Sequence, residues 1–188
     1  TVIDTEHLPP VLTSHSEKPI APIHRTLRYA VRKFLARIHM KRVVIGISGG
    51  IDSAVAAALY TSVLGAENVL LINMPSRFNS ETTKDLAHAL AENLGCYYAV
   101  FPIEESVQHT MKQIAATPIE LLKTGEKKTL AVSSFLAENI QARDRSSRIL
   151  AALAAAFGGG FSCNANKAET SVGYSTLYGD QAGFLAAL

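Results

Sequence analysis

The feature that most constrains the fold is a strand, turn and helix pattern at residues 43–59, VVIGISGGIDSAVAAAL. Its apolar opening is typical of a buried strand, with Val43, Val44, Ile45 and Ile47. The small apolar residues after Ser53 predict a helix that packs closely on a sheet. The turn between them holds glycines, two hydroxyls and a carboxylate, a set that a simple chain reversal does not need.

The rest of the chain alternates between strand and helix patterns. We predict strands at 43–47, 69–73, 96–101 and near 160–163, and helices at about 24–39, 52–64, 80–94, 104–115 and 134–157. Such alternation through short turns implies right-handed parallel crossovers. The expected fold class is therefore α/β, with a parallel sheet sandwiched by helices. Residues 117–132 favour a loop with a charged tip, which we hypothesise to be mobile.

Composition sets the number of domains and the classes of partner. With 188 residues, 48% of them hydrophobic, the chain can bury one sizeable core. We expect one domain at 23–188 after an extended arm or linker at 1–22, where prolines stand among polar residues. A net charge of +2 with scattered basic residues argues against nucleic acid as a partner. No stretch approaches the roughly 18 apolar residues of a membrane span, and no signal peptide is visible.

The two cysteines indicate the redox compartment. Cys96 and Cys163 are far apart in the sequence and lack the spacing of metal ligands. We interpret both as small buried residues that stay reduced, which indicates a cytoplasmic protein. The chain begins at Thr1 rather than Met, so we expect a fragment or a processed chain.

A glycine-rich turn between a strand and a helix N-terminus is typical of an anion site. Backbone N–H groups point outward there, the helix dipole favours negative charge, and glycine allows close approach of phosphate oxygens. No Lys follows the last glycine, as a Walker A loop requires, and the glycine spacing does not match the dinucleotide fingerprint. Asp52 would repel phosphates, so it suggests Mg²⁺ between protein and polyphosphate. The alternative is a carboxylate that only stabilises the helix N-terminus.

The turn resembles the pyrophosphate-binding loop S-G-G-x-D-S of the ATP pyrophosphatases, a group that includes GMP synthetase, asparagine synthetase and NAD synthetase. Three further stretches look like the NAD synthetase family: MPSRFNSETTKDLAHALAENLG (74–95), ENIQARDR (138–145) and NANKAETSVGYSTLYGDQAG (164–183). The resemblance covers about residues 24–188 and is closest to the synthetase domain of the glutamine-dependent enzymes. It implies the adenine-nucleotide alpha-hydrolase-like fold of the ATP pyrophosphatases.

The activity that the resemblance implies is an AMP-forming carbon-nitrogen ligase. ATP would adenylate the carboxylate of deamido-NAD (nicotinic acid adenine dinucleotide) with release of pyrophosphate, and ammonia would then displace AMP to give NAD. A carboxylate needs such a leaving group, and cations must neutralise the anions that meet there. The ammonia would come from glutamine if the full protein has a glutaminase domain. The first 22 residues contain no Cys for such a domain.

The resemblance also implies where ATP binds. The expected contacts are the turn residues Gly46, Ile47, Ser48, Gly49, Gly50, Ile51, Asp52 and Ser53. Asn164 falls where the family usually has a Thr that touches ATP, and its amide still offers a donor and an acceptor. Met74 and Arg77, after the second strand, are candidates for the adenosine edge. The resemblance assigns no certain catalytic acid or base.

The metal and the dinucleotide are assigned in the same way. Mg²⁺ would bind Asp52 and Glu169, although Glu169 could instead be a surface helix carboxylate. Arg143 matches the arginine that contacts deamido-NAD, and its guanidinium fork suits a phosphate or carboxylate. On charge pattern alone, Arg143 would be a surface residue paired with Asp144 or Glu138. Leu177 stands where some ammonia-dependent members carry a substrate-binding Lys, so that contact is absent here.

Two alternative functions stay open. Another ATP pyrophosphatase such as GMP synthetase shares the turn, although the motifs around Arg143 and Glu169 argue against it. The other is a truncated nucleotide-binding module without turnover, because the family continues past Leu188 with further ATP and dinucleotide contacts. We therefore expect the domain to be truncated at its C-terminal end. The family forms dimers or larger homo-oligomers, and the helix at 134–157 is a candidate for the subunit contact, with ordinary core packing as its alternative.

Overall fold

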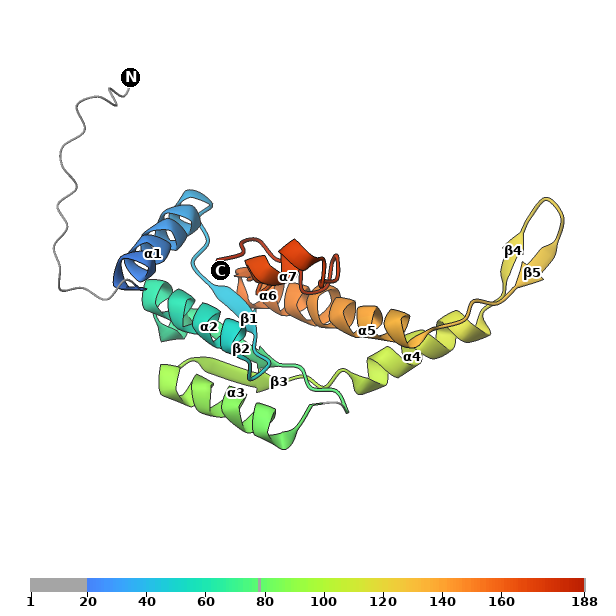
Figure 1. The fold of residues 1–188 in the computed structure, drawn as a ribbon, viewed down its shortest axis with the longest axis horizontal. Coiled ribbons are helices and arrows are strands. Elements are labelled where there is room, and N and C mark those ends of the chain that lie inside the picture. The colour runs from blue at the N-terminus through green and yellow to red at the C-terminus, as the bar shows by residue number, and fades with distance from the viewer. Residues whose placement is uncertain (1–19, 78, 188) are drawn as a thin grey trace, which may run out of the picture.

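A parallel sheet of four strands lies at the centre of the chain (Figure 1). The computed structural model describes residues 20–77 and 79–187. The strand order is β3-β2-β1-β6, with bounds β1 Val43–Gly46, β2 Val69–Asn73, β3 Tyr97–Val100 and β6 Gly160–Phe161. Every neighbouring pair in this order is parallel, which confirms the predicted fold class.

Helices cover both faces of the sheet because the strand residues alternate in direction. On one face, Val43 and Ile45 pack with the buried residues of α1 (Ile20–Arg37), α2 (Ile51–Leu64) and α3 (Glu81–Leu94). On the other face, Val44 and Ile72 pack with α4 (Glu104–Ala116) and with the long helix that precedes β6. A short 3-10 turn, η1 (Ala66–Asn68), leads from α2 into β2.

The predicted helix at 134–157 is continuous but not uniform. It consists of α5 (Ser134–Arg143), the π-helix η2 (Asp144–Leu150) and α6 (Ala151–Phe157). At the end of η2 the N–H of Ala151 donates to the carbonyl of Ser146, five residues back. Ile149, Leu150 and Ala154 are buried in the core, whereas α5 has no fully buried residue.

The first helix begins earlier than predicted. It starts at Ile20 rather than near residue 24, with Pro22 in its first turn. Proline is tolerated there because the first N–H groups of a helix have no intrahelical acceptor. The remainder of the predicted arm, residues 1–19, lies outside the described residues.

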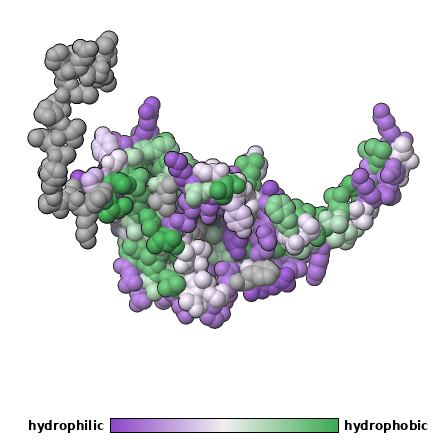
Figure 2. Space-filling view, in the orientation of Figure 1, coloured by the Kyte–Doolittle hydropathy of each residue, from purple (hydrophilic) through white to green (hydrophobic). Residues whose placement is uncertain are grey.

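Residues 117–132, predicted as a loop, contain an antiparallel hairpin. Its strands are β4 (Ile119–Leu121) and β5 (Glu126–Lys128), and all six residues are exposed. Glu120 and Lys127 face each other across the hairpin, with 3.5 Å between carboxylate and ammonium. Together α4 and the hairpin form an extension, residues 104–128, that projects from the sheet (Figure 1) and carries hydrophobic and hydrophilic residues side by side (Figure 2).

The described residues also bear on the predictions about cysteines and membranes. Cys96 and Cys163 are both free thiols, but each is half-buried rather than buried. Burial raises the pKa of the Cys96 thiol, although a hydrogen bond with Thr61 opposes the shift. Among the described helices, none has the length and apolar character needed to cross a bilayer.

Candidate functional site

The turn that joins β1 to α2 requires glycine at its centre. Gly49 has a φ of +86°, a region that side-chain-bearing residues rarely adopt. A Cβ at Gly49 would lie 2.3 Å from the carbonyl oxygen of Thr83, in the first turn of α3. The turn is therefore pressed against α3, and its shape depends on the missing side chain.

The two serines of the turn hold its shape. The Ser53 hydroxyl donates to the Gly50 carbonyl at 3.0 Å and accepts from the Ser48 N–H at 3.3 Å. The Ser48 hydroxyl accepts from the Gly50 N–H at 3.2 Å. Gly50 is the N-cap of α2 and no described side chain caps that helix end. The first N–H groups of α2 are thus left for another acceptor, as expected at an anion site.

A cavity of about 280 Å³ opens at the carboxyl end of β1. Of the residues predicted to bind ATP, those that line it are Gly46, Ile47, Ser48, Asp52, Ser53 and Asn164. The lining does not include Gly49, Gly50 or Ile51, and the Ile51 side chain is 74% exposed. Parallel strands of an α/β sheet characteristically bind ligands at this edge.

Asn164 uses its amide to join two strand ends. Its Nδ2 donates to the carbonyl of Gly46 at 2.8 Å, and its Oδ1 accepts from the Ser162 hydroxyl at 2.8 Å. The Nδ2 donor and the Oδ1 acceptor of Asn164, which we expected to contact ATP, therefore each bond to the protein. Its place in the cavity wall is consistent with a nucleotide contact, which stays a prediction.

Asn166 brings the two predicted metal ligands to one wall of the cavity. It is the N-cap of α7 (Lys167–Val172), and a capping box links it to Glu169 through bonds of 2.9 and 3.0 Å. Its Nδ2 also donates to Oδ2 of Asp52 at 3.3 Å. Asp52 and Glu169 both line the cavity. The sequence did not single out Asn166, although its spacing of three residues from Glu169 was the signal of a capping box.

The chemistry of this pair fits Mg²⁺. In the described part of the chain, Oδ1 of Asp52 and Oε1 of Glu169 have no protein donor. Mg²⁺ is usually held by one or two carboxylates together with phosphates and water. No group of three His, Cys, Asp or Glu side chains suited to a metal occurs among the described residues. Phosphate and water would therefore have to complete the coordination shell.

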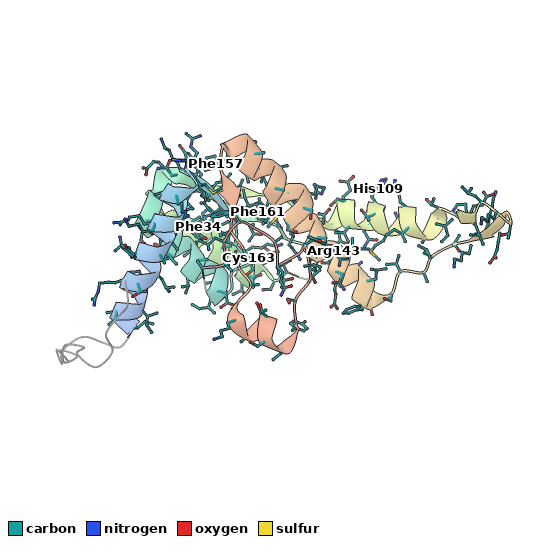
Figure 3. All side chains as sticks on the ribbon, turned by 90° about the horizontal axis from the view of Figure 1, so that it is seen from above. Phe34, His109, Arg143, Phe157, Phe161 and Cys163 are labelled. Atoms are coloured by element: carbon teal, nitrogen blue, oxygen red, sulfur yellow. The ribbon has the colours of Figure 1, made fainter. Side chains whose placement is uncertain are left out.

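Arg143 lies outside the cavity. It is exposed near the end of α5 (Figure 3). Its Nε donates to the carbonyl of Leu177 at 3.2 Å. The alternative partner Asp144 is paired instead with Arg148 at 2.7 Å. Within the described residues Arg143 has no ion pair, so its guanidinium keeps its charge available to a ligand.

Arg145 is a cavity residue that the sequence analysis did not identify. It lies two residues after Arg143 in the long helix, and its Nε donates to the carbonyl of Met74 at 3.2 Å. Burial lowers the pKa of Arg145, while the charge of Asp144 opposes that shift. The signal was present in the motif ENIQARDR, but spacing alone does not tell which arginine faces inward.

The two predicted adenosine contacts lie in different cavities. Met74 lines the first, whereas Arg77 lines a second cavity of about 550 Å³ between α4 and α5. Arg77 is held there by Glu104, at 3.7 Å between guanidinium and carboxylate. Arg145 lines both cavities, so the two are neighbours across its side chain.

The family model and the curated relatives that match this chain name the same family. The family model described as NAD synthase matches residues 23–188. The glutamine-dependent NAD(+) synthetase of Aquifex aeolicus is 38% identical over 165 residues, and that of Thermotoga maritima 35% over 167. Each match covers 87% of this chain and 27% of the relative, so the chain spans about a quarter of the length of these curated relatives.

Solved structures agree with the sequence relatives. A glutamine-dependent NAD+ synthetase from Acinetobacter baumannii, solved with ADP, matches 95% of this chain and 32% of its own with a TM-score of 0.81 and 31% identity. An NH3-dependent NAD synthetase from Campylobacter jejuni matches 92% of this chain and 68% of its own, with a TM-score of 0.77 and 26% identity.

Proposed function

The chain belongs to the NAD synthase family, and we propose on that premise that it is the ATP-using part of an enzyme that amidates deamido-NAD to NAD. The observation that carries the proposal is the cavity where the glycine turn, Asp52 and Glu169 meet. An uncapped helix N-terminus beside two carboxylates suits a polyphosphate with its cation.

The proposed reaction has two steps that balance. An oxygen of the nicotinate carboxylate attacks the α-phosphorus of ATP, and the bond from that phosphorus to the bridging oxygen breaks to release pyrophosphate. Ammonia then attacks the carbonyl carbon of the adenylate, the bond to AMP breaks, and the nitrogen loses a proton. In this proposal the glycine turn holds the pyrophosphate, and no side chain is assigned as acid or base.

Mg²⁺ is proposed to bind Asp52 and Glu169. When bound, the ion neutralises phosphate charge, including the charge that develops as pyrophosphate departs. Asn166 supports the proposal because it orients both carboxylates from one position, through its amide and its backbone N–H. A residue that fixes the ligands of a metal in this way commonly affects its affinity.

The dinucleotide is proposed to contact Arg143, and the adenosine of ATP to lie along Met74 and Arg77. Arg143 is exposed near Leu177, outside the cavity, so it would meet a part of the dinucleotide that extends beyond the reacting carboxylate. Met74 and Arg77 follow β2, the strand beside β1, so the adenosine would lie next to the turn that holds pyrophosphate.

Ammonia, a glutaminase domain and self-association complete the proposal. The relatives named glutamine-dependent support a glutaminase domain in the whole protein as the source of ammonia. A homodimer or larger oligomer would use α5, where Phe135 is 74% exposed, because the α6 half of the long helix is committed to the core. We propose a cytoplasmic location.

Turnover tests the reaction directly. The chain is mixed with ATP, Mg²⁺, ammonium and deamido-NAD, and NAD, AMP and pyrophosphate are measured by chromatography. Equal amounts of all three are expected, and none should form without deamido-NAD. Nicotinate mononucleotide, which lacks the adenylate half, serves as the competing acceptor. Nucleotide binding without any product would favour the module without turnover.

Substitution of Arg143 tests whether deamido-NAD is the substrate that is adenylated. Losing one charge-assisted contact weakens binding by about 10- to 150-fold, so Arg143→Ala should weaken deamido-NAD by that factor and leave ATP binding unchanged. Arg143→Lys should restore part of the loss because it keeps the charge but not the fork. Calorimetric titration with each ligand separately decides the matter. Unchanged deamido-NAD affinity would remove Arg143 from the site.

A further inference from the structure

Arg145 borders both of the cavities described above. The first cavity is lined by Ser48 and Asp52 from the glycine turn, and the second by Ser76 and Arg77. Met74, whose carbonyl accepts from Nε of Arg145, stands between these two sets along the chain. Arg145 therefore lies on the path from the proposed adenosine contacts to the proposed pyrophosphate site.

Arg145 has no direct ion pair among the described residues, although the charge of Asp144 acts on it from nearby. In the described part of the chain, no carboxylate lies within ion-pairing distance of it, and its only hydrogen bond is the one from Nε to Met74. The neighbouring carboxylate Asp144 is taken by Arg148, which binds it through two nitrogens at 2.7 and 2.8 Å. Both terminal nitrogens of Arg145 are left without a protein acceptor, and each can donate to an anion.

The Arg145 guanidinium is partly shielded from water and has no ion-pair partner among the described residues. Partial removal of a charge from water costs free energy that only a partner can return. Burial accordingly lowers the pKa of Arg145. Arginine nevertheless keeps its proton at neutral pH. An anion that enters between the cavities would therefore find a charged, partly shielded donor in Arg145.

We propose that Arg145 binds the α-phosphate of the nucleotide, the one phosphate that stays with the adenylate after pyrophosphate leaves. This assignment rests on the proposed function, since it takes adenosine along Met74 and Arg77 and pyrophosphate at the glycine turn. An ATP molecule laid in that direction brings its α-phosphate between the two. There the two terminal nitrogens of Arg145 can hold two phosphate oxygens while Nε stays on Met74.

The position also gives Arg145 a role in the first step of the reaction. Negative charge shifts among the α-phosphate oxygens while the carboxylate attacks and pyrophosphate departs. A fixed guanidinium aimed at those oxygens stabilises that charge without reorganising. It also keeps its contact through the second step, because the α-phosphate remains in the adenylate and then leaves with AMP.

The test compares ligands that contain different parts of ATP. Arg145→Met removes the charge and keeps an unbranched side chain of similar length. For this variant the affinity for AMP should fall by about 10- to 150-fold. The affinities for adenosine and for inorganic pyrophosphate should change by less than about threefold, the range of a surface substitution. Calorimetric titration, or competition against ADP where binding is weak, measures all three.

Arg148→Met is the matched control, one turn further along the same helix. Its guanidinium is paired with Asp144 and borders neither of the two cavities. This variant should bind AMP like the unmodified chain. Arg145→Lys should recover part of the AMP affinity, because a single ammonium replaces the fork.

Three results would overturn the proposal. Unchanged AMP affinity in Arg145→Met excludes the contact, and a selective loss of pyrophosphate binding assigns Arg145 to the other phosphates. Equal losses for AMP, adenosine and pyrophosphate, with a lower melting temperature of the ligand-free chain, show that Arg145 only supports the fold. None of these measurements needs deamido-NAD or turnover. The contact can therefore fail while NAD still forms, and it can hold in a chain that forms none.

Discussion

Replacing Gly49 with alanine should destabilise the chain more than the same change at Gly125. Both glycines have a positive φ, +86° and +74° respectively. Gly125 lies in the hairpin turn, and a Cβ there would have nothing within 4 Å. A Cβ at Gly49 would lie 2.3 Å from the Thr83 carbonyl oxygen, closer than real Cβ atoms come. Comparing the two variants therefore separates the free energy lost to a positive φ from the free energy lost to the clash with Thr83.

The magnitudes follow from these two terms. A positive φ costs an alanine about 1–2 kcal/mol at either position. At Gly49 the turn and the first turn of α3 must also move apart by at least about 0.7 Å, because Cβ contacts below 3.0 Å do not occur. Overpacking of this kind adds about 1–3 kcal/mol. We expect the free energy of unfolding to fall by about 2–5 kcal/mol in Gly49→Ala and by about 1–2 kcal/mol in Gly125→Ala.

Urea unfolding of both variants provides the measurement, with inorganic pyrophosphate titrated into each. Gly49→Ala should also bind pyrophosphate more weakly, since the turn has to open, while Gly125→Ala should bind it normally. Equal losses of unfolding free energy in the two variants would refute the reasoning from Thr83. Normal pyrophosphate binding by Gly49→Ala would refute the link between the turn and the phosphates.

Three further predictions use other parts of the chain. Asp52→Asn keeps the shape of the side chain but loses its charge, so Mg²⁺-dependent pyrophosphate release should vanish with an unchanged circular dichroism spectrum; release at the original rate would exclude the metal role. The backbone N–H of Arg77, followed by the amide of Gln108, lowers the pKa of Glu104. Glu104 therefore contributes stability above its usual pKa that is lost as the pH falls through its lower folded value. Glu104→Gln should flatten the acid side of a melting-temperature profile, and an identical profile would exclude that contribution. Trypsin should cut the exposed β5 near 127–128 more slowly once ATP and dinucleotide are added, whereas equal rates would count against a lid.

The central part of the fold could be predicted because one requirement, burial of apolar side chains, dominates its sequence. The strand predicted at 69–73 is β2 with the same bounds, since a run of branched apolar residues between polar ones has few other uses. The turn at 46–53 was predicted because glycines and serines that follow a buried strand and precede a helix pattern favour a tight turn between the two. That this turn binds phosphate stays a prediction. The hairpin at 119–128 could not be predicted, since all its strand residues are exposed and no burial pattern marks them.

The side chains around the turn were less predictable. Arg143 and Arg145 are equally polar in the sequence, yet only Arg145 borders the cavities. Which of them faces inward depends on the π-helix that begins at Asp144. Hydrogen bonds there join residues five apart instead of four, and this change leaves no clear trace in the sequence. Asn166 was overlooked for a different reason, because its contact with Asp52 joins residues that are 114 positions apart.

The π-helix η2 also sets which face α5 presents to α4. A residue of an α-helix accounts for about 100° of rotation, so the wider turns of η2 act as a one-residue phase shift between α5 and α6. Buried Leu150 and Ala154 hold the α6 side against the sheet. Deleting one residue between 144 and 150 would restore the α-helical period and turn α5 about its own axis by about 100°. The face that α5 offers to α4 would change with it, so the contacts between α5 and the base of the extension would have to form again with other side chains.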